Sequence, residues 1–317
     1  MSANSPSAAI PQIGPRPGRR RRPAMRGRWA GWGFVGPFMV VFTFALIVPI
    51  GYAIYLSLFR QQLIGGNAFV GFGNYKLALT DPQFWAALRR MLVFLVVQVP
   101  FMTVLALLAA LALDSARLRW APLYRLSIFL PYAVPAVVAA LMWGFMYGAQ
   151  FGLVARLRSA LGAWVPDPFS SSWVLAAIGN VVTWEFVGYN MLIFYSALRA
   201  VPRELYEAAE IDGASGTGVV RWIKLPALRP AIVVALIFSV IGSVQLFNEP
   251  EVLHWVSPDT LSTSFTPNMY AYNLSFAGQE YNYSAAIAIV MGVVTVIIAA
   301  LVQRYGQRRA ARAGAGA

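Results

Sequence analysis

Six apolar stretches, each long enough to cross a lipid bilayer, constrain the fold of this chain more than any other feature. A bilayer core about 30 Å thick requires about 20 consecutive apolar residues in a helix. Because lipid offers no hydrogen-bond partners to the backbone, stretches of this length must be helical. They lie at Trp32–Leu58, Met91–Leu113, Leu126–Gly148, Trp173–Leu198, Pro230–Asn248 and Tyr283–Gln303. We therefore expect an all-α integral membrane protein with six transmembrane helices.

The composition favours the same class of protein and argues against several others. Hydrophobic residues make up 59% of the chain and charged residues only 12%, about half the roughly 25% that is usual in soluble domains. The net charge of +13 could suggest nucleic acid, but the arginines concentrate at the termini and in alternate loops, so we expect no nucleic-acid partner. With no cysteine and one histidine, His254, the chain is expected to hold no metal.

The distribution of basic residues orients the chain. Nineteen of the 25 Lys and Arg residues fall on the side of the two termini and six on the other side. Since positive loops stay in the cytoplasm, both termini are predicted to be cytoplasmic. Residues 1–28 are expected to form a disordered basic arm, residues 29–303 the transmembrane domain, and residues 304–317 a frayed cytoplasmic tail.

Prolines and caps predict two local features. The segment LPYAVPAVV, Leu130–Val138, contains two prolines and is expected to be a kinked helix among other helices. Asp81 and Pro82 are a helix start, and we expect a short helix here that lies in the outer interface. In that helix Phe84 and Trp85 would face lipid.

One cytoplasmic loop, residues 199–229, is charged and helix-prone although it joins two apolar spans. Pro202 and Glu207 suit the first turns of a helix of about 11 residues, and Gly213 is a natural stop. So short a helix is marginal alone. The spacing leaves two interpretations open: a helix that docks on a partner protein, or a passive loop on the lipid headgroups.

Within this loop the spacing Glu-Ala-Ala, three residues, Gly, nine residues, Ile-x-Leu-Pro resembles the EAA signature of permease subunits in binding-protein-dependent ABC importers. It is formed by Glu207, Ala208, Ala209, Gly213, Ile223, Leu225 and Pro226. Further segments resemble the carbohydrate branch, the MalF/UgpA-like permeases. They are Gly71–Leu79, Phe129–Trp143, Gly188–Ser215 and Ile241–Leu253.

The resemblance implies a type I ABC importer permease (MetI-like) fold in a bacterial plasma membrane. It implies three kinds of partner besides lipid: a second permease subunit, two copies of a cytoplasmic ATPase and an extracytoplasmic solute-binding protein. In that family the EAA helix sits in a cleft of the ATPase, which makes Glu207 and Gly213 the strongest coupling candidates and Ala208 and Ala209 packing contacts. A di- or oligosaccharide is the implied substrate; polyols, glycerol-phosphate esters and monosaccharides stay open.

The chain has no phosphate-binding loop of its own. Such a loop needs Gly-Lys-Ser/Thr at its end, and the only lysines, Lys76 and Lys224, follow Tyr75 and Ile223. We therefore expect no bound cofactor and no catalytic residues here, with ATP and Mg²⁺ held by the separate ATPase.

Polar residues inside the spans are candidates for the substrate path, because an unpaired charge in a span costs several kcal/mol, about 3 on insertion scales. The candidates are Glu185, Tyr189, Asn190, Gln245 and Asn248. The alternative is that these groups hydrogen-bond helices together. A further alternative for the whole chain is an ion-coupled secondary transporter subunit, for which Glu185 is the one candidate ion site.

Overall fold

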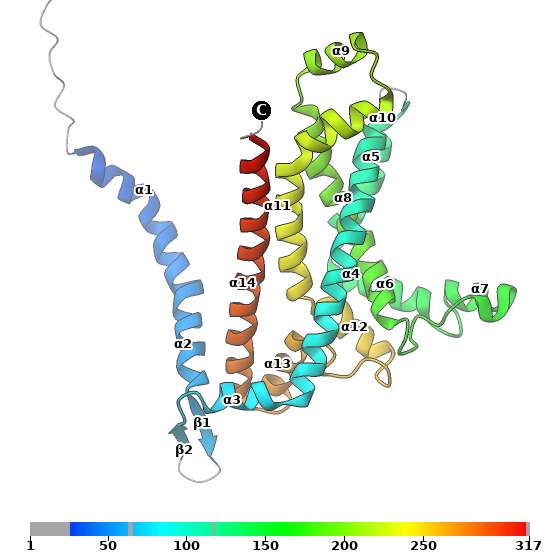
Figure 1. Cartoon of the computed structure of the whole chain (residues 1–317). Coiled ribbons are helices and arrows are strands. Elements are labelled where there is room, and N and C mark those ends of the chain that lie inside the picture. Colours follow the sequence, from blue (N-terminus) through cyan, green and yellow to red (C-terminus); the bar gives the residue numbers. More distant parts are fainter. Residues whose placement is uncertain (1–25, 63–65, 116–117, 315–317) are drawn as a thin grey trace, which may run out of the picture. The chain divides into compact units, whose positions relative to one another are not determined.

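The structure, a computed structural model, describes residues 26–62, 66–115 and 118–314 (Figure 1). The chain divides into two compact units, residues 1–51 and 52–317. Most of the predicted basic arm, residues 1–25, lies outside the described residues. In the first unit, α1 (Arg26–Phe42) continues through a π-helical turn, η1 (Thr43–Ile47), into the start of α2 (Val48–Ser57), which crosses the boundary between the units. Residues Trp32–Ser57 form a helix that is long and apolar enough to span a membrane, as predicted.

The second unit is helical apart from one short hairpin. Its elements are β1 (Phe59–Gln62), β2 (Gly66–Phe69), α3 (Gly73–Thr80), α4 (Pro82–Leu113), α5 (Ala121–Phe129), η2 (Leu130–Ala133), α6 (Ala136–Tyr147), α7 (Leu153–Leu161), η3 (Gly162–Trp164), α8 (Val174–Arg199), α9 (Arg203–Ile211), α10 (Gly216–Val219), η4 (Val220–Lys224), α11 (Leu225–Val244), α12 (Asn248–Val256), α13 (Pro267–Phe276) and α14 (Tyr281–Gly314). In the described parts of the chain, five helices could cross a membrane, and the pair α5–α6 could supply a sixth span. The all-helical membrane fold is thus confirmed.

The predicted kink in the third span is a sharp break. The helical segments Ala121–Ala133 and Ala136–Tyr147 meet at 98°. Pro135 explains the break, because a proline disfavours helical geometry in the residue before it, and Val134 is extended with ψ 129°. Two short helices replace the single bent helix that the sequence predicted.

The N-terminus of α4 corrects a second expectation. Asp81 does cap a helix, with its side chain accepting a hydrogen bond from the Gln83 backbone N–H at 2.8 Å, but the helix continues without interruption to Leu113. Phe84 is buried rather than lipid-facing, whereas Trp85 is half-exposed. The reason is helical periodicity: Phe84 shares a face with the buried core residue Leu88.

The second helix of the cytoplasmic loop is continuous with the fifth span, from Gly216 to Val244. A π-helical turn, η4, precedes Pro226, whose ring would clash with the carbonyl group four residues earlier in a regular α-helix. The span ends at Val244 rather than near Asn248, which begins α12. The last helix, α14, continues to Gly314, through most of the segment expected to be a tail.

Helix α4 packs against several helices of the second unit. It packs most extensively against α8 and also contacts α11 and α13. Figure 1 shows α9 beyond one end of this bundle, while α12 and α13 lie at the opposite end. We call these the α9 end and the α12 end. The core at the α9 end joins α4, α8 and α11 through Ala106, Ala110, Leu113, Met191, Phe194, Leu198, Leu228 and Ala235.

Candidate functional site

Helix α9 begins and ends where its sequence directs. Pro202 precedes its first residue and Glu204 lies in its first turn, where an acidic group is favoured by the helix dipole. At the other end Gly213 adopts φ +72°. The backbone N–H groups of Gly213 and Ala214 donate to the carbonyl groups of Glu210 and Ala209, the pattern of a Schellman cap. The predicted helix stop at Gly213 is confirmed.

The residues of the EAA pattern lie on two consecutive helices. Glu207 and Ala208 are exposed on α9, while Ala209 is half-buried. The three residues that complete the pattern are half-buried where η4 passes into α11; they are Ile223, Leu225 and Pro226. The first part of the EAA pattern thus lies on a largely exposed helix and the second part on a helix that is packed against the bundle. The coupling role of the EAA residues stays a prediction.

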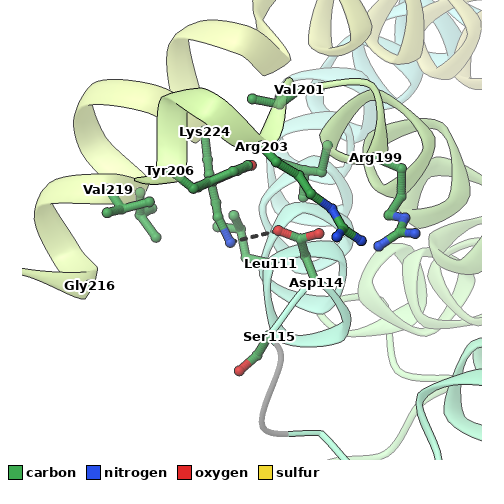
Figure 2. Close-up of a pocket in the computed structure, with 12 residues that line it drawn as sticks. Leu111, Asp114, Ser115, Arg199, Val201, Arg203, Tyr206, Gly216, Val219 and Lys224 are labelled. Carbon is green, nitrogen blue, oxygen red and sulfur yellow. Dashed lines mark hydrogen bonds and ion pairs between the residues drawn. The ribbon is translucent and has the colours of Figure 1, made fainter. Parts of the chain in front are cut away.

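A pocket of about 680 Å³ is enclosed by the ends of α4 and α8, by α9, and by α10 and η4 (Figure 2). Its lining is mixed, with three cationic side chains, one carboxylate and several apolar groups. The lining residues are Leu111, Asp114, Ser115, Leu198, Arg199, Val201, Arg203, Tyr206, Gly216, Val219, Val220 and Lys224. The pocket therefore separates α9 from the bundle on this side.

An ion pair crosses this pocket. Lys224 Nζ donates to Asp114 Oδ2 at 2.6 Å, and the two side chains are only 14% and 12% exposed. Lys224 Nζ also lies 5.7 Å from the centroid of the Tyr206 ring. Burial and the nearby Asp114 carboxylate raise the pKa of the Tyr206 hydroxyl.

Our sequence reasoning missed this contact, although one signal was available. Asp114 caps the C-terminal end of α4, where the helix dipole disfavours a negative charge. An acid at that position calls for a cation nearby, and Lys224 is one of only two lysines in the chain.

A second group of polar residues lies inside the bundle. Glu185 on α8 and Glu249 on α12 are only 3% and 6% exposed, and their carboxyl groups lie close enough to act on each other's protonation. Glu185 Oε2 is buried without a hydrogen-bond partner among the described residues. Two buried carboxyl groups in contact cannot both carry charge without a large cost, so the pair retains a proton. The predicted fifth span ends at Asn248, so the sequence did not place Glu249 inside the bundle.

The other predicted path residues do not gather at one point. Asn190 donates to Ser239 Oγ at 3.3 Å between α8 and α11, and Tyr189 stacks on Tyr132 of η2 with ring centroids 4.9 Å apart. Gln245 and Asn248 are exposed beyond the end of α11. The structure thus places Asn190 in a helix–helix contact, and a path role for the five residues stays a prediction.

At the α12 end, Asp81 joins three helices. Its Oδ2 accepts hydrogen bonds from the hydroxyl groups of Tyr270 on α13, at 2.6 Å, and Tyr283 on α14, at 2.7 Å. Burial alone would raise the pKa of Asp81, but these two hydroxyl groups and the backbone N–H groups of Gln83 and Phe84 hold it below its ordinary value.

The segment before α13 is fastened in a similar way. The Arg90 guanidinium on α4 donates to the backbone carbonyl groups of Ser264 and Phe265 at 3.0 and 2.9 Å.

Within residues 26–62, 66–115 and 118–314, no three His, Cys, Asp or Glu residues are grouped so as to hold a metal ion. The polar groups described above therefore join helices to one another.

Comparison of the sequence with known proteins identifies the family to which the chain belongs. The family model of the binding-protein-dependent transport system inner membrane component matches residues 90–312. The lactose transport system permease protein LacF of Rhizobium radiobacter is 33% identical over 287 residues, which cover 88% of this chain and 94% of LacF. The trehalose/maltose transport system permease protein MalF of Thermococcus litoralis is 31% identical over 284 residues, covering 88% and 94%.

A solved structure shares the fold. The crystal structure of a bacterial ABC transporter involved in import of the acidic polysaccharide alginate contains a chain that superposes with a TM-score of 0.79 at 20% identity. The match covers 90% of this chain and 97% of that one, which confirms the MetI-like permease fold. The family match also makes the chain a multi-pass inner-membrane permease component rather than an enzyme. This chain belongs to the family of binding-protein-dependent ABC transport system inner membrane components, in its carbohydrate-importer branch.

Proposed function

We propose that this chain is the permease subunit of an ATP-driven importer of a di- or oligosaccharide and forms half of the translocation pathway beside a second permease. The names of its relatives support a sugar: LacF is a lactose permease and MalF a trehalose/maltose permease. The diacetylchitobiose uptake permease NgcF of Streptomyces coelicolor, 32% identical over 284 residues, is a further example with a disaccharide.

The coupling role of α9 rests on one observation above all. Helix α9 carries the EAA residues and makes no extensive backbone contact with any other element that the structure describes. Apolar side chains nearby are open to solvent, with Ile211 87% and Trp222 73% exposed. A short, capped helix with exposed apolar groups requires a protein partner to cover them. We propose that this partner is a cytoplasmic ATPase, one of two copies in the complex.

The orientation follows from the same assignment. If α9 contacts a cytoplasmic ATPase, the α9 end of the bundle is cytoplasmic, as are both termini. The α12 end then faces outward, where a solute-binding protein would deliver the sugar. This assignment agrees with the excess of Lys and Arg in the loops of the α9 end.

Reconstitution tests the proposal. The chain would be purified with its second permease and ATPase and placed in liposomes with the binding protein outside and ATP inside. Calorimetry on the binding protein with lactose, maltose, trehalose and diacetylchitobiose would identify the sugar, and labelled sugar would then report uptake. We expect uptake only with ATP. Uptake by the chain alone under a proton or sodium gradient would establish the ion-coupled alternative instead.

A further inference from the structure

We infer that the Asp114–Lys224 ion pair is the contact through which movement of α9 reaches the transmembrane helix α4. Both residues are positioning residues for coupled transport. The inference rests on the proposed function, because it concerns how an ATPase bound to α9 would move the bundle.

The ion pair joins elements that are far apart in the sequence. Lys224 lies 110 residues after Asp114, and the two side chains are 14% and 12% exposed. The second ion pair that the described residues form, Arg158–Asp167, spans 3.2 Å with side chains 43% and 44% exposed. Water screens the exposed pair, whereas the covered pair is held more tightly because either charge alone would be costly.

Tyr206 connects α9 to this ion pair. Its ring faces Lys224 Nζ at 5.7 Å, within the distance for a cation–π contact, and Figure 2 shows the two side chains side by side. Among the described residues, the Tyr206 hydroxyl is buried without a hydrogen-bond partner, so its position is set by the contacts of its ring. A pocket lies between α9 and the end of α4, and the Asp114–Lys224 ion pair with the Tyr206 ring beside it crosses that space.

Helix α4 extends this connection to the other end of the bundle. It runs over 32 residues from Pro82 to Leu113, about 48 Å at 1.5 Å per residue, and acids flank it at both ends. Asp114 binds the cytoplasmic loop through Lys224, while Asp81 binds the hydroxyl groups of Tyr270 and Tyr283. A displacement of Lys224 would therefore be passed along α4 to α13 and α14.

The position of Asp114 strengthens the inference. An acid at the C-terminal end of a helix opposes the helix dipole, so Asp114 does not serve the stability of α4 by itself. Its carboxylate becomes favourable only when Lys224 is near. The end of α4 and the cytoplasmic loop thus hold each other in one arrangement, which is the property required of a transmitting contact.

The test compares Asp114→Asn and Lys224→Met in the reconstituted complex. The readout is the number of sugar molecules taken up per ATP hydrolysed, with labelled lactose, maltose and trehalose offered in turn. We expect each variant to lower this ratio at least about fivefold, the lower range of measured coupling effects. The double variant that combines Asp114→Lys and Lys224→Asp exchanges the two charges. It should restore part of the lost sugar uptake per ATP hydrolysed. Arg158→Met, which breaks the exposed ion pair, is the matched control and should leave the ratio unchanged.

Each outcome decides a different question. Absence of ATP-dependent uptake by the wild-type complex overturns the proposed function. An active wild type with unchanged ratios in both single variants overturns the inference alone. Co-purification of the ATPase checks assembly: if both variants fail to assemble and the exchanged pair does not repair this, the contact serves folding and the inference is wrong. A lowered ratio in assembled complexes, restored by the exchange, supports it.

Discussion

Gly188 lies so close to Ile128 that a Cβ atom at Gly188 would be 2.1 Å from the Ile128 carbonyl oxygen. It would also be 2.7 Å from the Phe129 Cα atom. Helix α8 therefore touches the backbone of α5 directly, just before the 98° break between α5 and α6. Because the obstacle is backbone, no side-chain rotation can relieve the contact, and the close approach needs glycine.

We expect Gly188→Ala to destabilise the protein. The added methyl group must push α5 away from α8, and overpacking of this kind costs about 1–3 kcal/mol or more. Thermal unfolding in detergent would show a lower Tm for the variant. Gly292→Ala on α14 is the matched control, because nothing lies within 4 Å of a Cβ atom there. Equal Tm values for the two variants would mean that α5 and α8 do not approach as described.

Gly213→Val should uncouple transport without preventing membrane insertion. Gly213 has φ +72°, which is strained for a β-branched residue by about 1–2 kcal/mol, so the cap that ends α9 is lost. We expect normal amounts of protein in the membrane and ATP-dependent sugar uptake reduced to a small fraction of wild type. Gly216→Ala, in the same loop but with ordinary φ and open space around it, should retain uptake. Full uptake by Gly213→Val would contradict the coupling role of α9.

The sequence predicted the spans well because a helix that crosses lipid must be apolar over a sufficient length. That length can be read from each stretch without knowledge of the helices that pack against it. The stop at Gly213 was equally predictable, since it depends on local backbone geometry. By contrast, the burial of Phe84 depends on α3, α11 and α14 packing around it, and no pattern in α4 alone reveals that. The start of α4 was predicted correctly from Asp81 and Pro82, but a capping residue does not indicate how far its helix continues.

The site contacts were hard to foresee for a related reason. Asp114 and Lys224 are 110 residues apart, and the Glu185–Glu249 contact joins α8 to α12, a helix that the sequence did not predict. Such pairs exist only after the helices have packed. Their members are visible in the sequence as isolated charges near apolar segments, but their partners are not.

Glu249→Gln should leave the protein at least as stable as wild type, whereas Glu249→Ala should destabilise it. Burial raises the pKa of Glu249 above its ordinary value. A neutral glutamine keeps the packing contact with Glu185 and removes the need to hold a proton in the pair. Alanine leaves the Glu185 carboxyl group buried without its partner, which costs about 1–3 kcal/mol. Thermal unfolding checks this, and a strong loss of stability in Glu249→Gln would contradict a proton shared by the two carboxyl groups.

Asp81→Ala should lower stability at neutral pH by about 1–3 kcal/mol, because it removes an N-cap and the acceptor of two tyrosine hydroxyl groups. The folded state holds the pKa of Asp81 below its ordinary value, so this stabilisation is fully present above the unfolded pKa of about 3.9 and is lost as pH falls through the folded pKa. The difference in Tm between wild type and Asp81→Ala should therefore be constant from neutral pH down to about pH 5 and shrink in stronger acid. Tyr283→Phe removes one of the two hydroxyl donors and should give a smaller loss. Arg158→Ala, at the exposed ion pair with Asp167, is the control and should change Tm little. A Tm for Asp81→Ala no lower than for this control would show that Asp81 does not hold α4 to α13 and α14.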